Sequence, residues 1–450
     1  MTTEVRGVRP HKKLVAAAAV GVLVLLAAAC GNSTSTTKAA STSTTAGSSS
    51  GTSGGKYPAV SAPGVSATQI SVGGVASVSN NPLGSVYGDS FKGVDAYFKM
   101  INAQGGIYGR KLVLSQKLDD QLGQNQAQVE QLLQDNVFSV IPVSVLLFSG
   151  AQTLVDQNIP TFGWAINGEW QGTAAEPRLN MFGESGSYLG ISAPSPVLPW
   201  LVQQKHAHRL GLLAYSVAQS ADCGTGVKNS FDKYGAAAGA KVAFDDESLA
   251  FGVADLSVQV SKMKQAGVDM VATCMDTTGV VTLAKEMKKQ QLNAVQYLPD
   301  GYDQQFLDSY GSLFQGSVVR TDFTQFQLTP QPAGLANYLK WIKTVTNTPN
   351  EQSMNGWLNA DLFYNGLKAA GPNFSRQALM DAINKMTKYQ ANGLLNGVNW
   401  TVAHTKSDGT YCQFFSTIQN SKYVMNYSRP GKPFLCVLYQ GGKLTSEYSG

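Results

Sequence analysis

Cysteine is the residue type whose spacing in this chain most directly indicates a chemistry. Of the five cysteines, Cys223, Cys274, Cys412 and Cys436 lie far from one another in the sequence, and none belongs to a C-x-x-C pair. Zinc sites usually need such closely spaced pairs, so we expect no metal site. In an oxidising compartment, four cysteines of this kind normally form two disulfides, for which three pairings are possible.

The positions of these cysteines relative to the expected strands favour one pairing. Cys223 and Cys274 each follow an apolar run typical of a strand, so both should lie at the carboxyl ends of strands in one sheet. Cys412 and Cys436 flank a segment typical of a terminal hairpin. We therefore predict the disulfides Cys223–Cys274 and Cys412–Cys436, each worth about 3 to 4 kcal/mol in the chain-entropy model.

No other arrangement of residues indicates catalysis, a cofactor or nucleic-acid binding. Residues 51–55 match the pattern G-x-S-x-G, but they lie in a low-complexity segment, whereas a nucleophile elbow needs a strand before it and a helix after it. Residues 224–226 begin like a dinucleotide-binding fingerprint, yet Asn229 replaces its third glycine. The formal net charge is +5 without a basic tract. We expect a protein that is not an enzyme.

The N-terminus has the order of charges found in a secretory signal peptide. Four basic residues precede an apolar run, residues 14–29, which is short for a membrane span and closes in small residues. Residues 27–30, Ala-Ala-Ala-Cys, resemble the bacterial lipobox, with Ala27 where leucine is usual. The resemblance implies cleavage before Cys30 and a diacylglycerol anchor on that cysteine. The alternative is ordinary cleavage after Ala29, without lipid.

The segment after the predicted anchor, residues 30–56, reads as a tether. It consists almost wholly of Ser, Thr, Gly and Ala, a composition that cannot bury enough apolar surface to fold. We therefore expect residues 1–29 to be a signal peptide, residues 30–56 to be a lipid-anchored linker, and the globular body to begin near residue 57.

The remaining residues alternate between strand and helix patterns in two runs, which a Pro- and Gly-rich stretch, residues 183–199, separates. Such alternation predicts parallel sheets covered by helices on both faces, so we expect an α/β fold with two doubly wound lobes. In the first run the expected strands are 70–78, 111–114 and 137–143, and the expected helices begin near 89, 124 and 150. In the second run the strands are 209–215, 241–244, 270–273 and 295–298, and the helices are 226–238, 256–266 and 279–290.

Residues 101–112, Ile-Asn-Ala-Gln-Gly-Gly-Ile-Tyr-Gly-Arg-Lys-Leu, followed by a paired aspartate at 119–120, resemble a family signature. The segment is similar to the first-lobe signature of type I periplasmic binding proteins, in the branch of the branched-chain amino acid receptors of ABC importers. The similarity continues through residues 299–301 and 393–410. It implies two lobes joined by three crossing segments, which close on a ligand about a hinge.

This resemblance implies a domain organisation. The crossings are expected near residues 182–187, 319–327 and 394–400. Lobe one would then comprise residues 57–186 with 326–393, and lobe two would comprise residues 187–325 with 394–450. In open parallel sheets a ligand binds beyond the carboxyl ends of the strands, so the loops after those strands should face the cleft.

The resemblance also implies ligand-binding residues in lobe one. Ser149 and Gly150 stand where the family has a serine- or threonine-rich turn that holds a ligand carboxylate; the alternative is a plain helix cap. Trp164, Ala165 and Asn167 lie in a segment similar to the one that binds the ligand amino group, with Asn167 in place of a threonine. Trp164 could instead belong to the core.

Three further residues complete the expected site. Tyr87 lies where the family often has an aromatic lid, and Asp300, flanked by Tyr302, matches an acidic residue that pairs with an amino acid's ammonium. The alternative for Asp300 is an ordinary turn residue before glycine. Cys223 and Cys274 replace positions where the family often has tyrosines, so a bridge between them would line the cleft and change the pocket.

These observations predict an extracytoplasmic lipoprotein that captures a small polar solute, such as an amino acid or amide, and delivers it to an ABC importer. The expected partners are the solute, the permease subunits and the membrane surface through the lipid, and the receptor is expected to act as a monomer without cofactor or nucleic acid. The alternative is a sensor or surface interaction module that uses the same fold without transport.

Overall fold

The structure, a computed structural model, describes residues 57–80, 85–299, 301–407 and 411–450. The predicted signal peptide, the predicted lipidation site Cys30, the predicted tether and Asp300 therefore lie outside the described residues. The described ranges belong to one compact unit, Gly55–Gly450. Within them, none of the helices combines the length and the apolar character needed to span a membrane.

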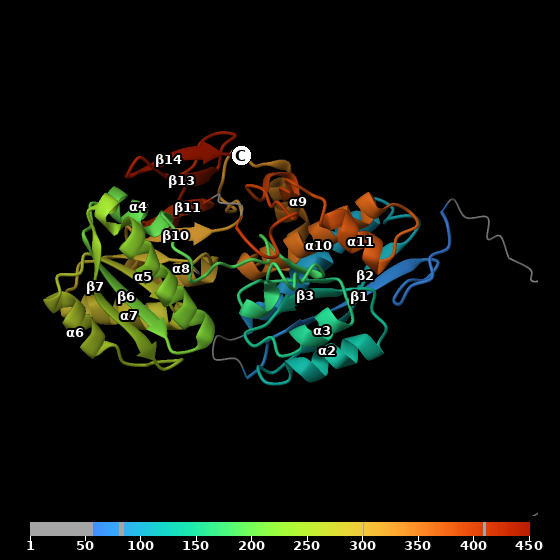
Figure 1. Ribbon diagram of the computed structural model, residues 1–450, viewed down its shortest axis with the longest axis horizontal. Helices are drawn as coiled ribbons and strands as arrows, with labels where there is room; N and C mark the ends of the chain where they lie inside the picture. Colours follow the sequence, from blue (N-terminus) through green and yellow to red (C-terminus); the bar gives the residue numbers. More distant parts are fainter. Residues whose placement is uncertain (1–56, 81–84, 300, 408–410) are drawn as a thin grey trace, which may run out of the picture. The chain divides into compact units, whose positions relative to one another are not determined.

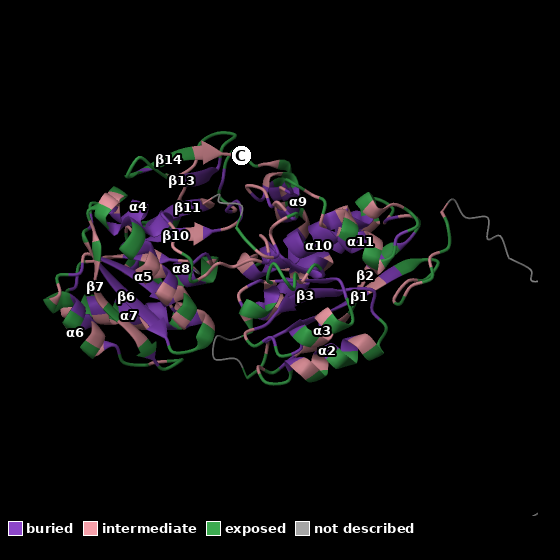
Figure 2. Cartoon of the chain, viewed as in Figure 1, coloured by how far each residue is buried: buried purple, intermediate pink, exposed green. Residues whose placement is uncertain are grey.

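The first sheet is formed by five parallel strands in the order β2-β1-β3-β4-β5. The strands are β1 (Gln69–Ala76), β2 (Lys111–Asp119), β3 (Val140–Ser144), β4 (Thr161–Gly163) and β5 (Met181–Gly183). Every residue of β3, β4 and β5 is buried, as expected for strands with helices on both faces (Figure 2).

Helices from two distant parts of the chain cover this sheet. They are α1 (Asp89–Ala103), α2 (Asn125–Gln134), α3 (Ala151–Asp156), α9 (Ala333–Ile342), α10 (Glu351–Ala370) and α11 (Arg376–Ile383). The long helix α10 packs against α1 and strands β3 and β4, whereas α2 packs against α3 and strands β1 and β2. In Figure 1 the orange helices α10 and α11 accordingly lie beside the blue and cyan strands of the first sheet.

The second sheet is larger and mixed. Its parallel part has the order β7-β6-β8-β9-β10, and strands β11, β13 and β14 continue it in antiparallel fashion, with β12 paired to β11. The parallel strands are β6 (Arg209–Tyr215), β7 (Lys241–Leu249), β8 (Met270–Cys274), β9 (Val295–Leu298) and β10 (Val318–Thr321). The others are β11 (Cys412–Gln419), β12 (Lys422–Val424), β13 (Phe434–Gln440) and β14 (Lys443–Ser449).

The second sheet also carries helices, so the predicted α/β class with two parallel-rich sheets is confirmed. The helices are α4 (Val197–Gln204), α5 (Ala218–Ala238), α6 (Ser257–Gln265), α7 (Thr277–Gln290) and α8 (Gln304–Tyr310). Helices α4 and α5 pack together, as do α6 and α7. The antiparallel strands β11, β13 and β14 are a difference from a purely parallel lobe, and they are the red strands of Figure 1.

Three connecting segments between the two sheets bond to one another. Ser187, after β5, donates its backbone N–H to the carbonyl of Ala403 at 3.0 Å. Thr324, after β10, donates to the carbonyl of Leu394 at 2.8 Å. These contacts involve the segments in which the crossings are expected. The exact division into lobes stays a prediction.

Both predicted disulfides are present. Cys223–Cys274 joins α5 to the last residue of β8, with the two Cα atoms 5.9 Å apart. Cys412 and Cys436 lie directly opposite each other on the antiparallel strands β11 and β13. One detail of the reasoning was wrong, because Cys223 is not at a strand end. Helix α5 begins earlier than expected, so this cysteine lies inside the helix.

Candidate functional site

A cleft of about 1670 Å³ lies between the carboxyl ends of the parallel strands of both sheets. On the first-sheet side its described lining includes residues that follow β3, β4 and β5, and on the second-sheet side residues that follow β6, β8, β9 and β10. Loops follow the strand ends here, so the residue types that line the cleft can differ between proteins while the sheets hold the loops in position. This position is the one expected for a ligand site.

Tyr87, Trp164 and Ala165 meet on the first-sheet wall of the cleft, and their contact with a ligand stays a prediction. Tyr87 belongs to a short 3-10 helix, Val86–Gly88, which leads directly into α1, and its ring centroid is 5.1 Å from that of Trp164. Tyr87 and Ala165 are buried, whereas Trp164 keeps partial exposure. The wall therefore offers an aromatic pair with one accessible ring.

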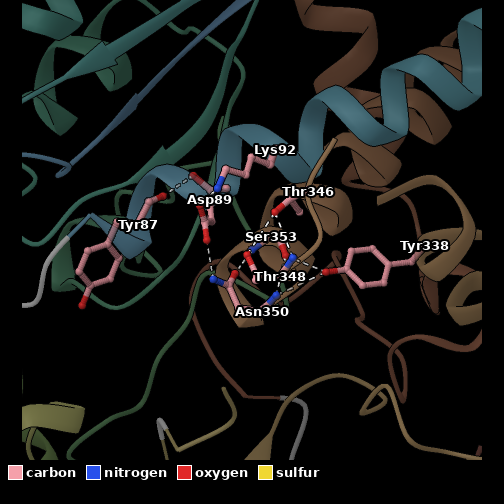
Figure 3. Close-up of polar contacts among 9 residues, drawn as sticks. Tyr87, Asp89, Lys92, Tyr338, Thr346, Thr348, Asn350 and Ser353 are labelled. Atoms are coloured by element: carbon pink, nitrogen blue, oxygen red, sulfur yellow. Dashed lines mark hydrogen bonds and ion pairs between the residues drawn. The ribbon is translucent and has the colours of Figure 1, made fainter. Parts of the chain in front are cut away.

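A polar network fixes the start of α1 to the start of α10 beside this wall (Figure 3). Asp89 accepts a hydrogen bond from the Asn350 side chain at 2.6 Å and pairs with Lys92 at 2.5 Å. Asn350 caps α10 by accepting from the backbone N–H of Ser353, whose hydroxyl in turn accepts from the Asn350 N–H. Tyr338 bonds to the same hydroxyl at 2.7 Å. Tyr87 is thus held on a fixed support.

Two glycines allow the close approach of these helices. A Cβ added to Gly93 of α1 would lie 1.9 Å from the carbonyl oxygen of Ser353, and one added to Gly356 of α10 would lie 1.9 Å from that of Ser90. Any larger residue would push the helices apart. The sequence analysis did not find this contact, although a glycine inside a helical pattern is a signal of close packing.

Ser149, Gly150 and Asn167 are not brought to the described lining of the cleft. The Ser149 hydroxyl accepts a hydrogen bond from the N–H of Gln126, and Gly150 donates its N–H to the side chain of Asn125. These bonds join α2 to the start of α3. Asn167 is buried and donates to the carbonyl of Leu146 at 2.8 Å. In this structure these three residues form structural hydrogen bonds. The Ser149 hydroxyl bonds to the first turn of α2 and does not cap α3, the helix for which a cap was considered.

Tyr302, another predicted ligand-binding residue, lines the cleft, but its hydroxyl is already hydrogen-bonded within the protein. It donates to the side chain of Gln327 at 2.8 Å and accepts from the N–H of Phe326 at 2.6 Å. Burial raises the pKa of this phenol well above its ordinary value. Tyr302 therefore anchors the segment after β10. Its hydroxyl is occupied by these bonds, so only its ring is available to contact a solute.

The second-sheet wall contains the disulfide Cys223–Cys274 and, next to it, Asp276. The Asp276 carboxylate accepts from the Tyr215 hydroxyl at 2.9 Å and caps α7 by accepting from the N–H of Gly279 at 2.7 Å. Burial, and then the negative charge of Asp276, raise the pKa of Tyr215. The carboxylate is thus committed to holding the wall together.

Glu184, immediately after β5, is the acidic group that the sequence analysis missed. It lines the cleft with 9% of its surface exposed, and its Oε2 accepts from the N–H of Ala165 at 2.8 Å. The pKa of its carboxyl is raised to about 7, chiefly by burial and secondarily by the charge of Asp322, while the backbone hydrogen bonds and Arg320 act to lower it. Arg320 and Asp322 also line the cleft and are 3.0 Å apart.

The described residues contain no cluster of three or more His, Cys, Asp or Glu side chains suited to a metal ion.

Comparisons with known proteins identify the family of this fold. A family model described as periplasmic binding protein matches residues 69–419. A comparison with curated proteins found no match.

Solved structures share the fold at low sequence identity. A branched-chain amino acid transporter substrate-binding protein from Streptococcus pneumoniae, in complex with isoleucine, is 16% identical with a TM-score of 0.64, covering 79% of this chain and 98% of its own. A solute-binding protein from R. palustris in complex with 4-hydroxybenzoate is 15% identical with a TM-score of 0.61, covering 85% and 95%. A fatty acid ABC transporter substrate-binding protein from Thermomonospora curvata is 16% identical with a TM-score of 0.64, covering 79% and 90%.

Proposed function

We propose that this chain, which belongs to the periplasmic binding protein family, captures a small polar solute in its cleft and delivers it to an ABC importer. The family is one of binding proteins rather than enzymes. The similar structures bear names that refer to an amino acid, an aromatic acid and fatty acids, so the fold alone does not choose the solute.

The observation that carries this proposal is the cleft itself, because both of its walls are built from the carboxyl ends of parallel strands. The walls also touch, since Gln219 of α5 donates to the carbonyl of Leu146, after β3, at 3.1 Å. We propose closure about the three crossings, with lobe one formed by residues 57–186 and 326–393 and lobe two by residues 187–325 and 394–450. Closure would present a new surface to the permease.

A thermal-shift screen of amino acids, amides, polyols and aromatic acids tests the capture of a solute. A solute present at 100 times its dissociation constant should stabilise the protein by about 2.7 kcal/mol and raise its Tm. Trp164→Ala should weaken binding at least tenfold by calorimetry, because this ring is a partly exposed aromatic of the first wall. Trp341→Ala, in α9 and away from the described lining, is the matched control. Equal loss in both variants, or no stabilising solute, would count against the cleft as a binding site.

We also propose that lipid on Cys30 anchors the receptor to the extracytoplasmic face of the membrane, where the Ser- and Thr-rich residues 31–56 act as a tether. The support comes from the signal-peptide order and the lipobox-like residues 27–30. Cys30→Ala should move the protein from the membrane fraction to the soluble fraction after cell fractionation, whereas Ser35→Ala, a change within the tether, should not. Membrane retention of the Cys30→Ala protein would contradict the anchor.

A further inference from the structure

Among the described aspartates and glutamates that line the cleft, Glu184 is the only one whose side chain is buried. Asp89, Asp276 and Asp322 each bond to at least one side chain. Asp303 caps α8 by accepting from the N–H of Phe306. Glu184, like Asp303, accepts from backbone N–H, and no side chain among the described residues donates to either of its oxygens. Unlike Asp303, it is buried.

Such a carboxyl is expensive to ionise where it stands. A buried carboxylate costs several kcal/mol unless an opposite charge or several hydrogen bonds compensate it. The nearby guanidinium of Arg320 is paired with Asp322 at 3.0 Å, and Asp322 accepts a further bond from Gln413 at 3.3 Å. Glu184, Arg320 and Asp322 together carry a net charge of −1 whenever Glu184 is ionised. A cation entering the cleft would supply the missing partner.

The charge of the cleft as a whole also favours a cationic solute. Among the described residues that line it, acidic side chains outnumber basic ones by seven to four. Low-dielectric walls focus this field into the cleft and raise the local concentration of cations. An anionic solute would have to enter against that field.

The surroundings of Glu184 also supply an apolar surface. Its hydrogen-bond donor, Ala165, directly follows Trp164, and the Trp164 ring packs against Tyr87 at 5.1 Å. The accessible ring and the carboxyl thus belong to one wall. Aromatic faces attract cations and cover apolar groups, so this wall suits a solute with a charged nitrogen and an apolar body.

From this geometry we infer that Glu184 contacts the bound solute and selects one that carries a cationic nitrogen, as an ammonium or amidinium group. The inference rests on the proposed function, since it concerns the same cleft. It assigns to the segment after β5 the acidic role that the sequence had suggested for Asp300, which lies outside the described residues. Trp164 and Tyr87 would cover the apolar part of the solute.

Matched probes separate the nitrogen from the apolar body. Isoamylamine, phenethylamine, L-leucine and L-phenylalanine carry an ammonium, whereas isocaproate and 3-phenylpropionate have similar bodies without one. In calorimetry at pH 8, every compound that binds should carry a cationic nitrogen. Within the probe set, the binders should therefore come from the first four compounds, and in the wider screen they should come from the nitrogen-bearing compounds. Glu184→Gln should weaken that binding at least tenfold. Glutamine still accepts from Ala165, so the fold should be kept, and Glu176→Gln, an exposed change outside the described lining, is the control.

Proton release distinguishes direct contact from a structural role. With a pKa of about 7, Glu184 is half protonated at pH 7, so a cation bound beside it should release about half a proton. The charged groups that act on this carboxyl in the apo protein are Asp322 and Arg320. Calorimetry in phosphate and in Tris buffer measures the release. It should vanish in Glu184→Gln and persist in Glu176→Gln.

The outcomes separate the inference from the proposed function. If the protein binds a solute that lacks a cationic nitrogen, or if Glu184→Gln keeps wild-type affinity and proton release, the inference is wrong and the receptor function stands. If neither the matched probes nor the wider screen stabilises the wild-type protein, the proposed function fails and the inference fails with it.

Discussion

Replacing Cys223 and Cys274 together by serine is expected to lower the free energy of unfolding by about 4 kcal/mol in the chain-entropy model. The bond joins residues separated by 51 positions, so its loss frees a long loop in the unfolded chain. Urea unfolding of the double variant and the wild type under non-reducing conditions measures the difference. Equal stabilities would mean that the bond does not restrict the unfolded chain as the model assumes.

The same double variant should also bind solute more weakly, because the bond fixes the second-sheet wall. Cys274 ends β8, and two residues later Asp276 holds both Tyr215 and the start of α7. Serine substitution at Cys412 and Cys436, whose separation is 24 positions, is the control for the loss of stability alone, because Cys412 also lines the cleft. It should destabilise the protein slightly less than the first double variant and leave the Asp276 contacts in place.

Two parallel strands were predicted with their observed bounds because a continuous apolar run is a simple signal, whereas the short strands β4 and β5 were not assigned bounds from the sequence. Residues 209–215 and 295–298 were predicted with the bounds that the structure gives to β6 and β9. The strands β2 and β7 were predicted too short, ending at 114 and 244 rather than at Asp119 and Leu249. Both lie at the edge of the parallel part of their sheets, where polar residues face solvent and interrupt the apolar pattern.

Glycine misled the prediction of α5. The helix begins at Ala218 rather than at 226, and it contains Gly224 and Gly226. A Cβ on Gly226 would lie 2.0 Å from the carbonyl oxygen of Ile191, so this glycine serves close packing and not a turn. The sequence does not distinguish a glycine in a turn from a glycine at a close contact inside a helix; only the tertiary contact does so.

The cleft was predictable in outline but not in detail. Tyr87, Trp164, Ala165 and Tyr302 line it because loops after strands meet at one edge. Ser149, Gly150 and Asn167, by contrast, form local or helix-to-helix hydrogen bonds that sequence spacing could not specify. The importance of Glu184 could not be predicted either, because it depends on burial and on which neighbours fail to pair with it.

Ionisation of Glu184 should lower the free energy of unfolding of the wild type by about 3 kcal/mol at pH 8 relative to pH 4.5, and Glu184→Gln should abolish this loss. The Glu184 carboxyl has a pKa of about 7 in the folded protein against an ordinary 4.5. Between these values the folded state keeps a proton that the unfolded state has lost, so stability falls as pH rises through this window. Glutamine does not titrate, so the stability of the variant should not show this decrease with pH.

His404 acts in the opposite sense over nearly the same window, which makes the comparison of two proteins necessary. Burial lowers the pKa of this imidazole from 6.5 to about 4, so the unfolded state binds more protons there and stability rises with pH. The contributions of Glu184 and His404 to the pH dependence of stability should nearly cancel in the wild type from pH 4.5 to 6.5. Glu184→Gln should reveal the rise that His404 causes.

Urea unfolding of wild type, Glu184→Gln and the exposed control Glu176→Gln at pH 4.5, 6 and 8 measures both trends. The stability difference between Glu184→Gln and wild type should grow by about 3 kcal/mol across this range, while the control follows the wild type. Contributions from the remaining titrating groups cancel in this difference. A constant difference at all three pH values would mean that Glu184 is already paired or solvated in the empty cleft, and the need for a cationic partner would disappear with it.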